Sequence, residues 1–231
     1  MLNYDNFAET FAKSRKNMKW QEIDYFLNNY FISSFKGGLE GDILDIWCGS
    51  WRLLEQLLTS PLAPLLKGEG KYTWIDLSSW LLKEAKKSFP DKEFLKLNML
   101  DLDSPLLIKE GVRGWSYLFF IPSFHHLDNL EDREEVLKKA YNLLEKWWKI
   151  FMTNWALNSK LNKEKYNNSI IENSKNKFWS IDYSIKIWKD TRYYHCFDLS
   201  ELEYLAKKSW FKIIENRLFD NMRNFITILE K

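Results

Sequence analysis

Short apolar runs and amphipathic stretches alternate along most of this chain. Four apolar runs predict strands: Lys71–Leu77, Glu93–Leu97, Tyr117–Ile121 and Lys149–Asn154. Between them, residues 78–88 begin with a serine cap, and residues 129–145 place leucine, valine and alanine on one face, so both segments predict helices. Helices that alternate with apolar strands imply an α/β fold, in which helices cover both faces of a mostly parallel sheet.

The chain divides into a short N-terminal extension and one main domain. Residues 1–36 predict two helices, Tyr4–Lys13 and Trp20–Phe35, and residues 37–231 predict the domain that holds the sheet. Two near-identical stretches with proline and glycine, at about 59–70 and 104–114, interrupt the pattern. We interpret both as insertions into exposed loops, which cost little stability and are not expected to carry function.

The stretch 42–57 passes from an apolar strand through a turn of small residues into leucines at helical spacing. This is the order of a nucleotide-binding strand, loop and helix, whose glycines let backbone N–H groups approach the ligand. Gly49 is present, but Trp47 and Trp51 stand where a D-x-G-x-G-x-G pattern from Asp45 would have its first and last glycines. With glycine at both, the segment reads ILDIGCGSGRLLEQL and resembles motif I of the class I S-adenosylmethionine (SAM) methyltransferases.

This resemblance implies SAM as cofactor and a Rossmann-like sheet of seven strands. The sheet would end in an antiparallel C-terminal hairpin, here the strands Phe211–Asn216 and Asn224–Leu229 after a helix at Leu199–Lys208. It also implies that the residues of the first loop surround the cofactor: Asp45, Trp47, Cys48, Gly49 and Trp51.

Further cofactor contacts are expected after the second and third strands. Asp76 ends the second strand, with Leu77 next to it, where a carboxylate can accept both ribose hydroxyls; a helix-capping role is the alternative. Asn98 and Met99 follow the third strand, where the family commonly has an acidic and then an apolar residue against adenine. Two N-terminal residues are candidates to reach the carboxylate of SAM, Tyr4 and Arg15, although a plain surface role for Arg15 is equally open.

Tryptophan outnumbers glycine in this chain, with 12 Trp and 8 Gly among 231 residues. Glycine usually makes up about 7% of a protein. Many of these tryptophans lie in loops, at helix ends or at strand starts, where glycine has a conformational role. We hypothesise that the gene reads UGA as glycine and that the printed sequence translates UGA as tryptophan. The positions concerned are Trp47, Trp51, Trp74, Trp80, Trp147, Trp148, Trp188 and Trp210, with Trp115 and Trp179 less clear. Trp20 and Trp155 are expected to be genuine tryptophans in either case. The alternative to the hypothesis is an inactive paralogue in which all the tryptophans are genuine.

A narrower resemblance involves four separate segments. These are Phe11–Arg15, His125-His126 with Arg133, Thr153–Leu157 and Arg192–Phe197. They are similar to the family that methylates the carboxymethyl group on the wobble uridine of tRNA. The resemblance implies tRNA as a partner, with a small activating protein as a further one, and a substrate side that includes His126, Trp155, Tyr193 and Tyr194.

The candidate acceptor residues suit a carboxylate. A carboxylate is already ionised at pH 7 and needs a cation to place it, for which Arg192 with the neighbouring His195 is the candidate. An amine or phenol would need a general base instead, and His125 or His195 could serve. A small-molecule methyltransferase with the same cofactor site therefore remains a competing interpretation.

Residues 158–190 predict a substrate lid that is rich in lysine. Lys160 and Lys163 are expected to contact RNA phosphates, and a solvated loop is the alternative. The net charge of +2 neither requires nor excludes nucleic acid. Two distant cysteines, no signal peptide and no long apolar run favour a cytoplasmic protein without a membrane span or a metal site.

Overall fold

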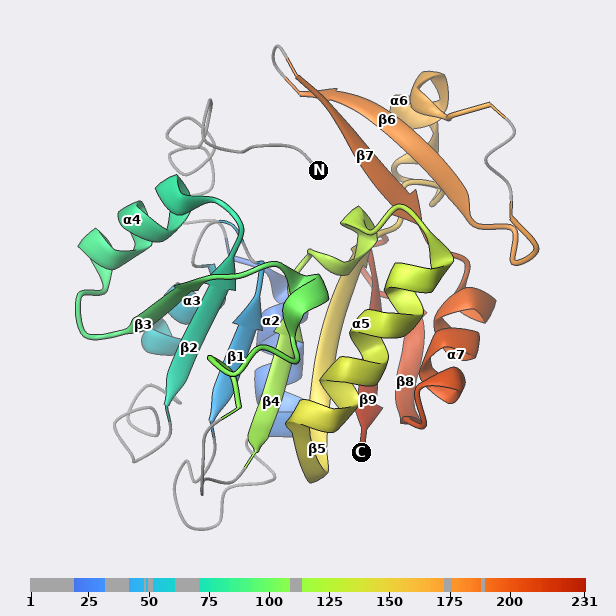
Figure 1. Ribbon diagram of the computed structural model, residues 1–231. Helices are drawn as coiled ribbons and strands as arrows, with labels where there is room; N and C mark the ends of the chain where they lie inside the picture. Colours follow the sequence, from blue (N-terminus) through green and yellow to red (C-terminus); the bar gives the residue numbers. More distant parts are fainter. Residues whose placement is uncertain are drawn as a thin grey trace.

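Figure 1 shows the computed structural model of the chain, which describes residues 19–31, 42–47, 49, 52–60, 71–108, 114–172, 176–187 and 190–231. Four residues predicted for the cofactor site lie outside these ranges: Tyr4, Arg15, Cys48 and Trp51. The predicted helix Tyr4–Lys13 and residues 61–70 of the first insertion also lie outside them.

One sheet of seven strands has the order β3-β2-β1-β4-β5-β9-β8. The strands are β1 Ile43–Ile46, β2 Tyr72–Asp76, β3 Glu93–Lys96, β4 Trp115–Phe120, β5 Leu144–Trp155, β8 Lys212–Leu218 and β9 Asn224–Glu230. Strands β1 to β5 pair in parallel, whereas β9 runs antiparallel to both β5 and β8. The predicted mostly parallel sheet with its antiparallel C-terminal hairpin is therefore confirmed.

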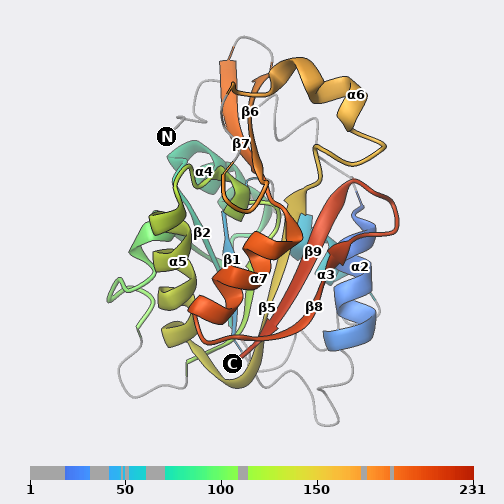
Figure 2. The same ribbon diagram turned by 90° about the vertical axis from the view of Figure 1, so that its right-hand side faces the viewer.

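Helices cover both faces of this sheet (Figures 1 and 2). They are α2 Gln21–Phe26, α3 Arg52–Thr59, α4 Ser79–Ser88, α5 Leu130–Leu143 and α7 Leu199–Lys208. None of the helices in the described ranges is long and apolar enough to cross a membrane.

Alternate side chains of the central strands build two cores. On one face Phe119 and Phe151 stack at 5.0 Å and pack with α2 and α3. On the other face Phe120 and Met152 pack with α5 and α7. This division follows from the period of two in a strand, which points successive side chains to opposite faces.

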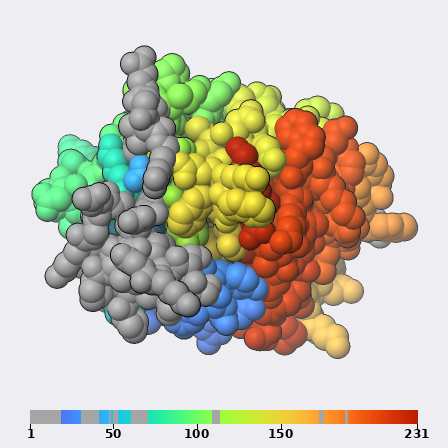
Figure 3. Space-filling model, turned by 90° about the horizontal axis from the view of Figure 1, so that it is seen from below, coloured from blue at the N-terminus to red at the C-terminus, as the bar shows by residue number. Residues whose placement is uncertain are grey.

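The predicted boundary between the helix 129–145 and the strand Lys149–Asn154 is wrong. The helix ends at Leu143 and β5 begins at Leu144, which pairs with Trp115 of β4, and the end of the chain pairs with β5 a few residues further on. The backbone N–H of Trp147 donates to the carbonyl oxygen of Lys231 at 2.8 Å. Figure 3 shows the chain end, in dark red, beside the yellow residues around the start of β5.

The second predicted helix is shorter than Trp20–Phe35. Helix α2 begins at Gln21, after Trp20 in an extended conformation, and continues as a π-helical turn, η2 Leu27–Phe31. Gln56 of α3 fixes this start, since its side chain accepts the backbone N–H of Trp20 and donates to its carbonyl oxygen.

The predicted substrate lid contains a second, two-stranded antiparallel sheet. Its strands are β6 Ile181–Ile187 and β7 Asp190–Cys196, preceded by the short helix α6 Lys163–Tyr166 and the turn η7 Asn167–Ser169. The β6–β7 hairpin and α6 stand above the carboxyl ends of the central parallel strands (Figures 1 and 2). Ligands of open α/β sheets bind at this edge, so the hairpin is placed next to the expected site.

Candidate active site

The first loop leaves β1 through residues in the left-handed region of backbone conformation. Trp47 has φ of 57° and Gly49 has φ of 62°. The indole Nε1 of Trp47 donates to the carbonyl oxygen of Leu97 at 3.1 Å, so the side chain reaches from the end of β1 to the chain after β3. Asp45, in β1, is fully buried and accepts a hydrogen bond from the hydroxyl of Tyr72. The backbone of this loop has the shape that glycine favours, while an indole lies across it.

Asp76 lies at the carboxyl end of β2, beside the first loop. Its Oδ1 accepts the backbone N–H of Ser78 at 2.8 Å, and the backbone N–H of Gly49 also donates to the carboxyl. Burial raises the pKa of Asp76 to about 7 against these hydrogen bonds, which lower it. Leu77, the next residue, is half-buried. A hydrogen bond thus connects Asp76 to Gly49 at the carboxyl edge of the sheet. The contact of Asp76 with the ribose of SAM stays a prediction.

Asn98 and Met99 follow β3 and begin the turn η5 Met99–Asp101. The side-chain oxygen of Asn98 accepts the backbone N–H of Leu100 at 3.1 Å and caps this turn. Met99 is fully buried in the core. Their predicted contacts with adenine stay predictions, since the structure places them at the right edge but gives each a local partner.

Four aromatic side chains gather where β4 and β5 end below the hairpin. This aromatic cluster consists of His125 and His126 in the turn η6 Phe124–His126, Trp155 at the end of β5, and Tyr194 in β7. Trp155 and Tyr194 stack at 4.9 Å with an angle of 4° between their rings. The ring of Tyr194 lies 5.2 Å from that of His125 and 4.9 Å from that of His126. Residues that are far apart in sequence therefore pack together in this aromatic cluster.

Burial lowers the pKa of both histidines of the aromatic cluster. Burial lowers the pKa of His125 well below its usual value, and the charges of His126 and His195 lower it further. Burial lowers the pKa of His126 to about 4; its bond to the carbonyl oxygen of Tyr193 opposes this shift, and the charge of Arg192 adds to it. His125 Nδ1 accepts the backbone N–H of Trp155 at 3.2 Å. Rings with such low pKa values are weak bases.

The four residues Arg192 to His195 divide between the two sides of β7. Arg192 and Tyr194 lie on the side of the aromatic cluster, and Arg192 is only 3% exposed. His195 lies on the other side, with Nδ1 2.6 Å from Asp182 and Nε2 2.9 Å from Glu201. The hydroxyl of Tyr193 also donates to Asp182. The catalytic role predicted for His195 and the substrate role of Tyr193 stay predictions, but these side chains have partners on the side away from the cluster.

Sequence reasoning missed Asp182 and Glu201, the two carboxylates that hold His195. Asp182 stands opposite His195 in the β6–β7 register, and Glu201 follows in the first turn of α7. The strand period could have separated Arg192 from His195, but β6 itself was not predicted. In the described part of the chain, no three His, Cys, Asp or Glu side chains are grouped to hold a metal ion.

The predicted lysines of the lid lie at the surface. Lys160 and Lys163 are exposed, and Lys163 begins α6. Tyr166, which ends this helix, has its ring 6.5 Å from that of Trp155. Helix α6 therefore holds both an exposed lysine and a tyrosine that lies against the aromatic cluster. Contact of the lysines with RNA stays a prediction.

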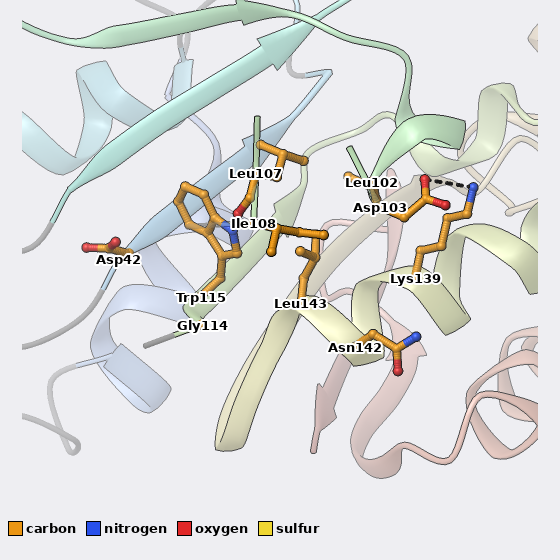
Figure 4. Close-up of a pocket in the computed structure, with 10 residues that line it drawn as sticks. All are labelled: Asp42, Leu102, Asp103, Leu107, Ile108, Gly114, Trp115, Lys139, Asn142 and Leu143. Atoms are coloured by element: carbon orange, nitrogen blue, oxygen red, sulfur yellow. Dashed lines mark hydrogen bonds and ion pairs between the residues drawn. The ribbon is translucent and has the colours of Figure 1, made fainter. Parts of the chain in front are cut away.

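A cavity of about 320 Å³ lies at the opposite edge of the sheet, near the first residues of β1 and β4 (Figure 4). Leucine and tryptophan side chains line most of it, and Lys139 and Asp103 form an ion pair of 3.1 Å at one end. Leu107, from the second insertion, is buried here, and its backbone carbonyl oxygen accepts a hydrogen bond from the indole N–H of Trp115. The cavity is separate from the aromatic cluster, which lies at the carboxyl edge.

Several solved structures that this chain resembles in fold are SAM-dependent methyltransferases. A methyltransferase from Methanosarcina mazei matches 88% of this chain and 97% of its own, with 16% identity and a TM-score of 0.63. One from Clostridium acetobutylicum matches 98% of each chain, with 14% identity and a TM-score of 0.64. The 1,6-didemethyltoxoflavin-N1-methyltransferase of Burkholderia thailandensis, solved with S-adenosylhomocysteine, matches 99% of this chain and 84% of its own, with 11% identity and a TM-score of 0.59.

No family model and no curated protein matches the sequence. The chain has the Rossmann-like fold of the class I SAM-dependent methyltransferases, as predicted.

Proposed function

We propose that this protein is a SAM-dependent methyltransferase that transfers the methyl group to a carboxylate oxygen. The observation that carries the proposal is the buried Arg192, whose charge acts on His126, together with the lowered pKa of both His125 and His126. A carboxylate is ionised at pH 7, and a guanidinium orients it by charge-assisted hydrogen bonds. Methyl transfer from a sulfonium then needs alignment of nucleophile and methyl group rather than a strong base. Histidines with depressed pKa values suit this chemistry better than deprotonation of an amine or phenol.

The carboxyl edge supplies the groups that would hold SAM. Gly49 and Asp76 are already joined there, and Asn98 stands at the neighbouring strand end. SAM would supply the activated methyl group. The protein would place it toward the aromatic cluster, where the stacked Trp155 and Tyr194 would help to exclude water from the reacting atoms.

We further propose that tryptophans at glycine positions are UGA-encoded glycines. Among the described residues, five non-glycine residues have a positive φ, and four of them are tryptophan: Trp47, Trp147, Trp179 and Trp210. Only a few per cent of non-glycine residues adopt this conformation, and Asn, Asp and His lead among them. Trp210 follows the C-cap residue of α7. Its backbone N–H donates to the carbonyl oxygen of Lys207, and the backbone N–H of Phe211 donates to the carbonyl oxygen of Ala206. This is the Schellman arrangement, in which glycine is the usual residue.

The remaining described tryptophans either agree with the hypothesis or do not test it. Trp155 stacks on Tyr194 and Trp20 is extended, as expected of genuine tryptophans. Trp74, Trp80, Trp115 and Trp148 have no positive φ, so backbone conformation does not discriminate there. Trp51 and Trp188 lie outside the described residues. Codon sequencing and mass spectrometry of the native protein test the proposal, and UGG codons at positions 47, 147, 179 and 210 would end it.

For the acceptor, we propose the carboxymethyl group of a modified wobble uridine in tRNA. The resemblance of the Arg192–Phe197 and Thr153–Leu157 segments supports this choice. Exposed lysines at 160, 163 and 165 provide charge for phosphates, and the neighbouring aromatic cluster offers faces on which a base could stack. A small activating protein, as a further partner, belongs to the same proposal.

A small molecule is the second candidate acceptor. The observation in its favour is that one similar solved structure is, by its name, a 1,6-didemethyltoxoflavin-N1-methyltransferase with bound 1,6-didemethyltoxoflavin. If the tryptophans are genuine, a third outcome follows, because the Trp47 indole spans the cofactor edge and the chain would be a non-catalytic paralogue.

The test uses the glycine form, expressed with glycine at every UGA codon. SAM binding is measured by calorimetry, and tRNA from cells that lack the corresponding gene is treated and digested for nucleoside mass spectrometry. We expect a methyl ester, recognised by release of methanol in mild alkali. Alkali-stable methylation would contradict the carboxylate proposal. Ester formation on small acids but not on tRNA would select the second candidate.

A further inference from the structure

His195 is held between two carboxylates. It is 2% exposed, and its ring nitrogens lie 2.6 Å from Asp182 Oδ1 and 2.9 Å from Glu201 Oε2. A carboxylate oxygen at each distance accepts a hydrogen bond, so both ring nitrogens must donate. A ring that donates from both nitrogens is an imidazolium.

A protonated His195 gives equal numbers of positive and negative charges among the four ionisable side chains Asp182, Glu201, Arg133 and His195. Glu201 is fully buried, and Arg133 of α5, 4% exposed, has Nε 3.6 Å from its second oxygen. Asp182 and Glu201 contribute two negative charges, and Arg133 with a protonated His195 contributes two positive charges. A neutral His195 would place an unprotonated ring nitrogen against a carboxylate oxygen, at 2.6 Å from Asp182 or 2.9 Å from Glu201, where two acceptors would face each other.

Each element packed against His195 contributes to this network. From β7 the hydroxyl of Tyr193 donates to Asp182 at 2.7 Å, and Asn176 before β6 donates to Glu201 at 2.9 Å. Arg133 also lies over the ring of Phe197 at 5.7 Å. The hydrogen bond and charge of His195 and the charge of Arg133 lower the pKa of Glu201 to about 2 although burial acts to raise it.

The network ties the hairpin to the main domain close to the acceptor residues. Asp182 belongs to β6, His195 to β7, Glu201 to α7 and Arg133 to α5. The backbone carbonyl of Tyr193 accepts from Nδ1 of His126 at 3.2 Å. A shift of β7 would therefore move Arg192 and Tyr194 relative to the aromatic cluster.

We propose that His195 is a positioning residue, a buried imidazolium that links Asp182 to Glu201 and fixes the β6–β7 hairpin over the carboxyl edge. The statement about Arg192 and the acceptor rests on the proposed function. The protonated bridge and the anchored hairpin do not depend on it.

The protonation state is tested first, by ¹⁵N NMR of histidine-labelled, full-length glycine form. The chain has only three histidines, which makes assignment direct. We expect two protonated ring nitrogens on His195 at pH 7, and neutral rings for His125 and His126. A neutral His195 would overturn the proposal.

The anchoring is tested by amide hydrogen exchange of Asp182→Asn and Asp182→Ala. Alanine removes both charge and acceptor, so we expect faster exchange throughout β7, whereas asparagine can still accept from Nδ1 and should restore most of the protection. Glu203→Gln is the control, because Glu203 is an exposed carboxylate of α7 that forms an ion pair with Lys207 of the same helix. Unchanged exchange in Asp182→Ala would contradict the anchoring role.

Kinetics then connect the bridge to the acceptor. In Asp182→Ala we expect the KM for the acceptor to rise about tenfold or more. This is the change in affinity expected when one hydrogen bond to a charged group is lost. The dissociation constant of SAM should stay unchanged. An unchanged KM together with a loosened hairpin would remove the positioning role. If no acceptor is methylated by any form, the proposed function fails, while NMR and exchange still decide whether the bridge exists.

Discussion

The indole nitrogen of Trp47 donates to the carbonyl oxygen of Leu97 at 3.1 Å, across the edge where the class I fold binds its cofactor. The same residue has a φ of 57°, a conformation that costs roughly 1–2 kcal/mol for a residue with a Cβ. Trp47 therefore combines an unfavourable backbone with a side chain that lies across the predicted cofactor edge. Glycine at this position would remove both.

The first prediction is that glycine at positions 47 and 51 creates SAM affinity. We expect the double variant Trp47→Gly/Trp51→Gly to bind SAM in calorimetry and the form with tryptophan at both positions to show no binding, because the indole of Trp47 spans the edge. Trp210→Gly in that tryptophan form is the control, since Trp210 lies beyond α7 and should leave SAM binding absent. Equal affinity with tryptophan at 47 and 51 would refute the assignment of this loop.

The second prediction concerns backbone strain at Trp210. Trp210→Gly and Trp210→Ala both remove the ring that packs on Tyr141, so their difference isolates the Cβ at a φ of 63°. We expect the glycine variant to have the larger unfolding free energy, by about 1 kcal/mol, in urea titrations. At Glu203, inside the same helix, glycine should instead be less stable than alanine by about 1 kcal/mol. The same sign at both sites would contradict the glycine hypothesis at position 210.

The third prediction follows from the raised pKa of Asp76. Because burial raises this pKa to about 7 from about 4 in the unfolded chain, the folded state binds the proton more tightly. Its contribution to stability is present at low pH and is lost as pH rises from about 4 to 7. Asp76→Asn should remove this decline in urea titrations across that range. Asp103→Asn, at an exposed carboxyl of lowered pKa, should leave it intact.

Asp76 also gives a cofactor prediction, tested in the glycine form. Asp76→Ala should weaken SAM binding by roughly 1.5–3 kcal/mol, the range for hydrogen bonds to a charged group. Calorimetry measures the dissociation constant. An unchanged value would exclude Asp76 from the cofactor site.

The fourth prediction is that Arg192 acts on the acceptor and not on SAM. In Arg192→Gln we expect methyl transfer to fall about 10- to 100-fold, because the buried charge that would hold the acceptor carboxylate is removed, with SAM affinity unchanged. Arg223→Gln is the matched control, since Arg223 is exposed in the turn before β9. Equal losses in both variants would argue against a specific cation at position 192.

The fifth prediction is that the exposed lysines of the lid bind tRNA phosphates. Replacing Lys160, Lys163 and Lys165 by glutamine should weaken tRNA binding without affecting SAM. It should also flatten the salt dependence by roughly 0.7–0.9 for each phosphate that is no longer neutralised. Glutamine at Lys207, Lys208 and Lys212, exposed around the end of α7, serves as the control of equal charge. If both triple variants retain the parent slope, the small-molecule acceptor becomes the better candidate.

The sequence alone predicted the order of the strands and helices that build the main sheet, and the edge at which the site is expected. Those features depend on local chemistry: apolar runs, a serine cap at Ser78, and a loop whose glycine requirement is visible at Trp47 and Gly49. The helix Leu199–Lys208 was predicted to the residue, because its start and end are set by the Asp198 cap and by Trp210. Local patterns fix such elements without reference to the rest of the chain.

Only the tertiary structure decided which side chains meet. It started β5 at Leu144, since this residue pairs with Trp115 of β4, and it paired Asp182 with His195. It also placed Arg192 and His195 on opposite sides of β7, and it made His126 a weak base by burial beside Arg192. These outcomes depend on strand pairing and desolvation between segments far apart in sequence, and a local pattern contains neither.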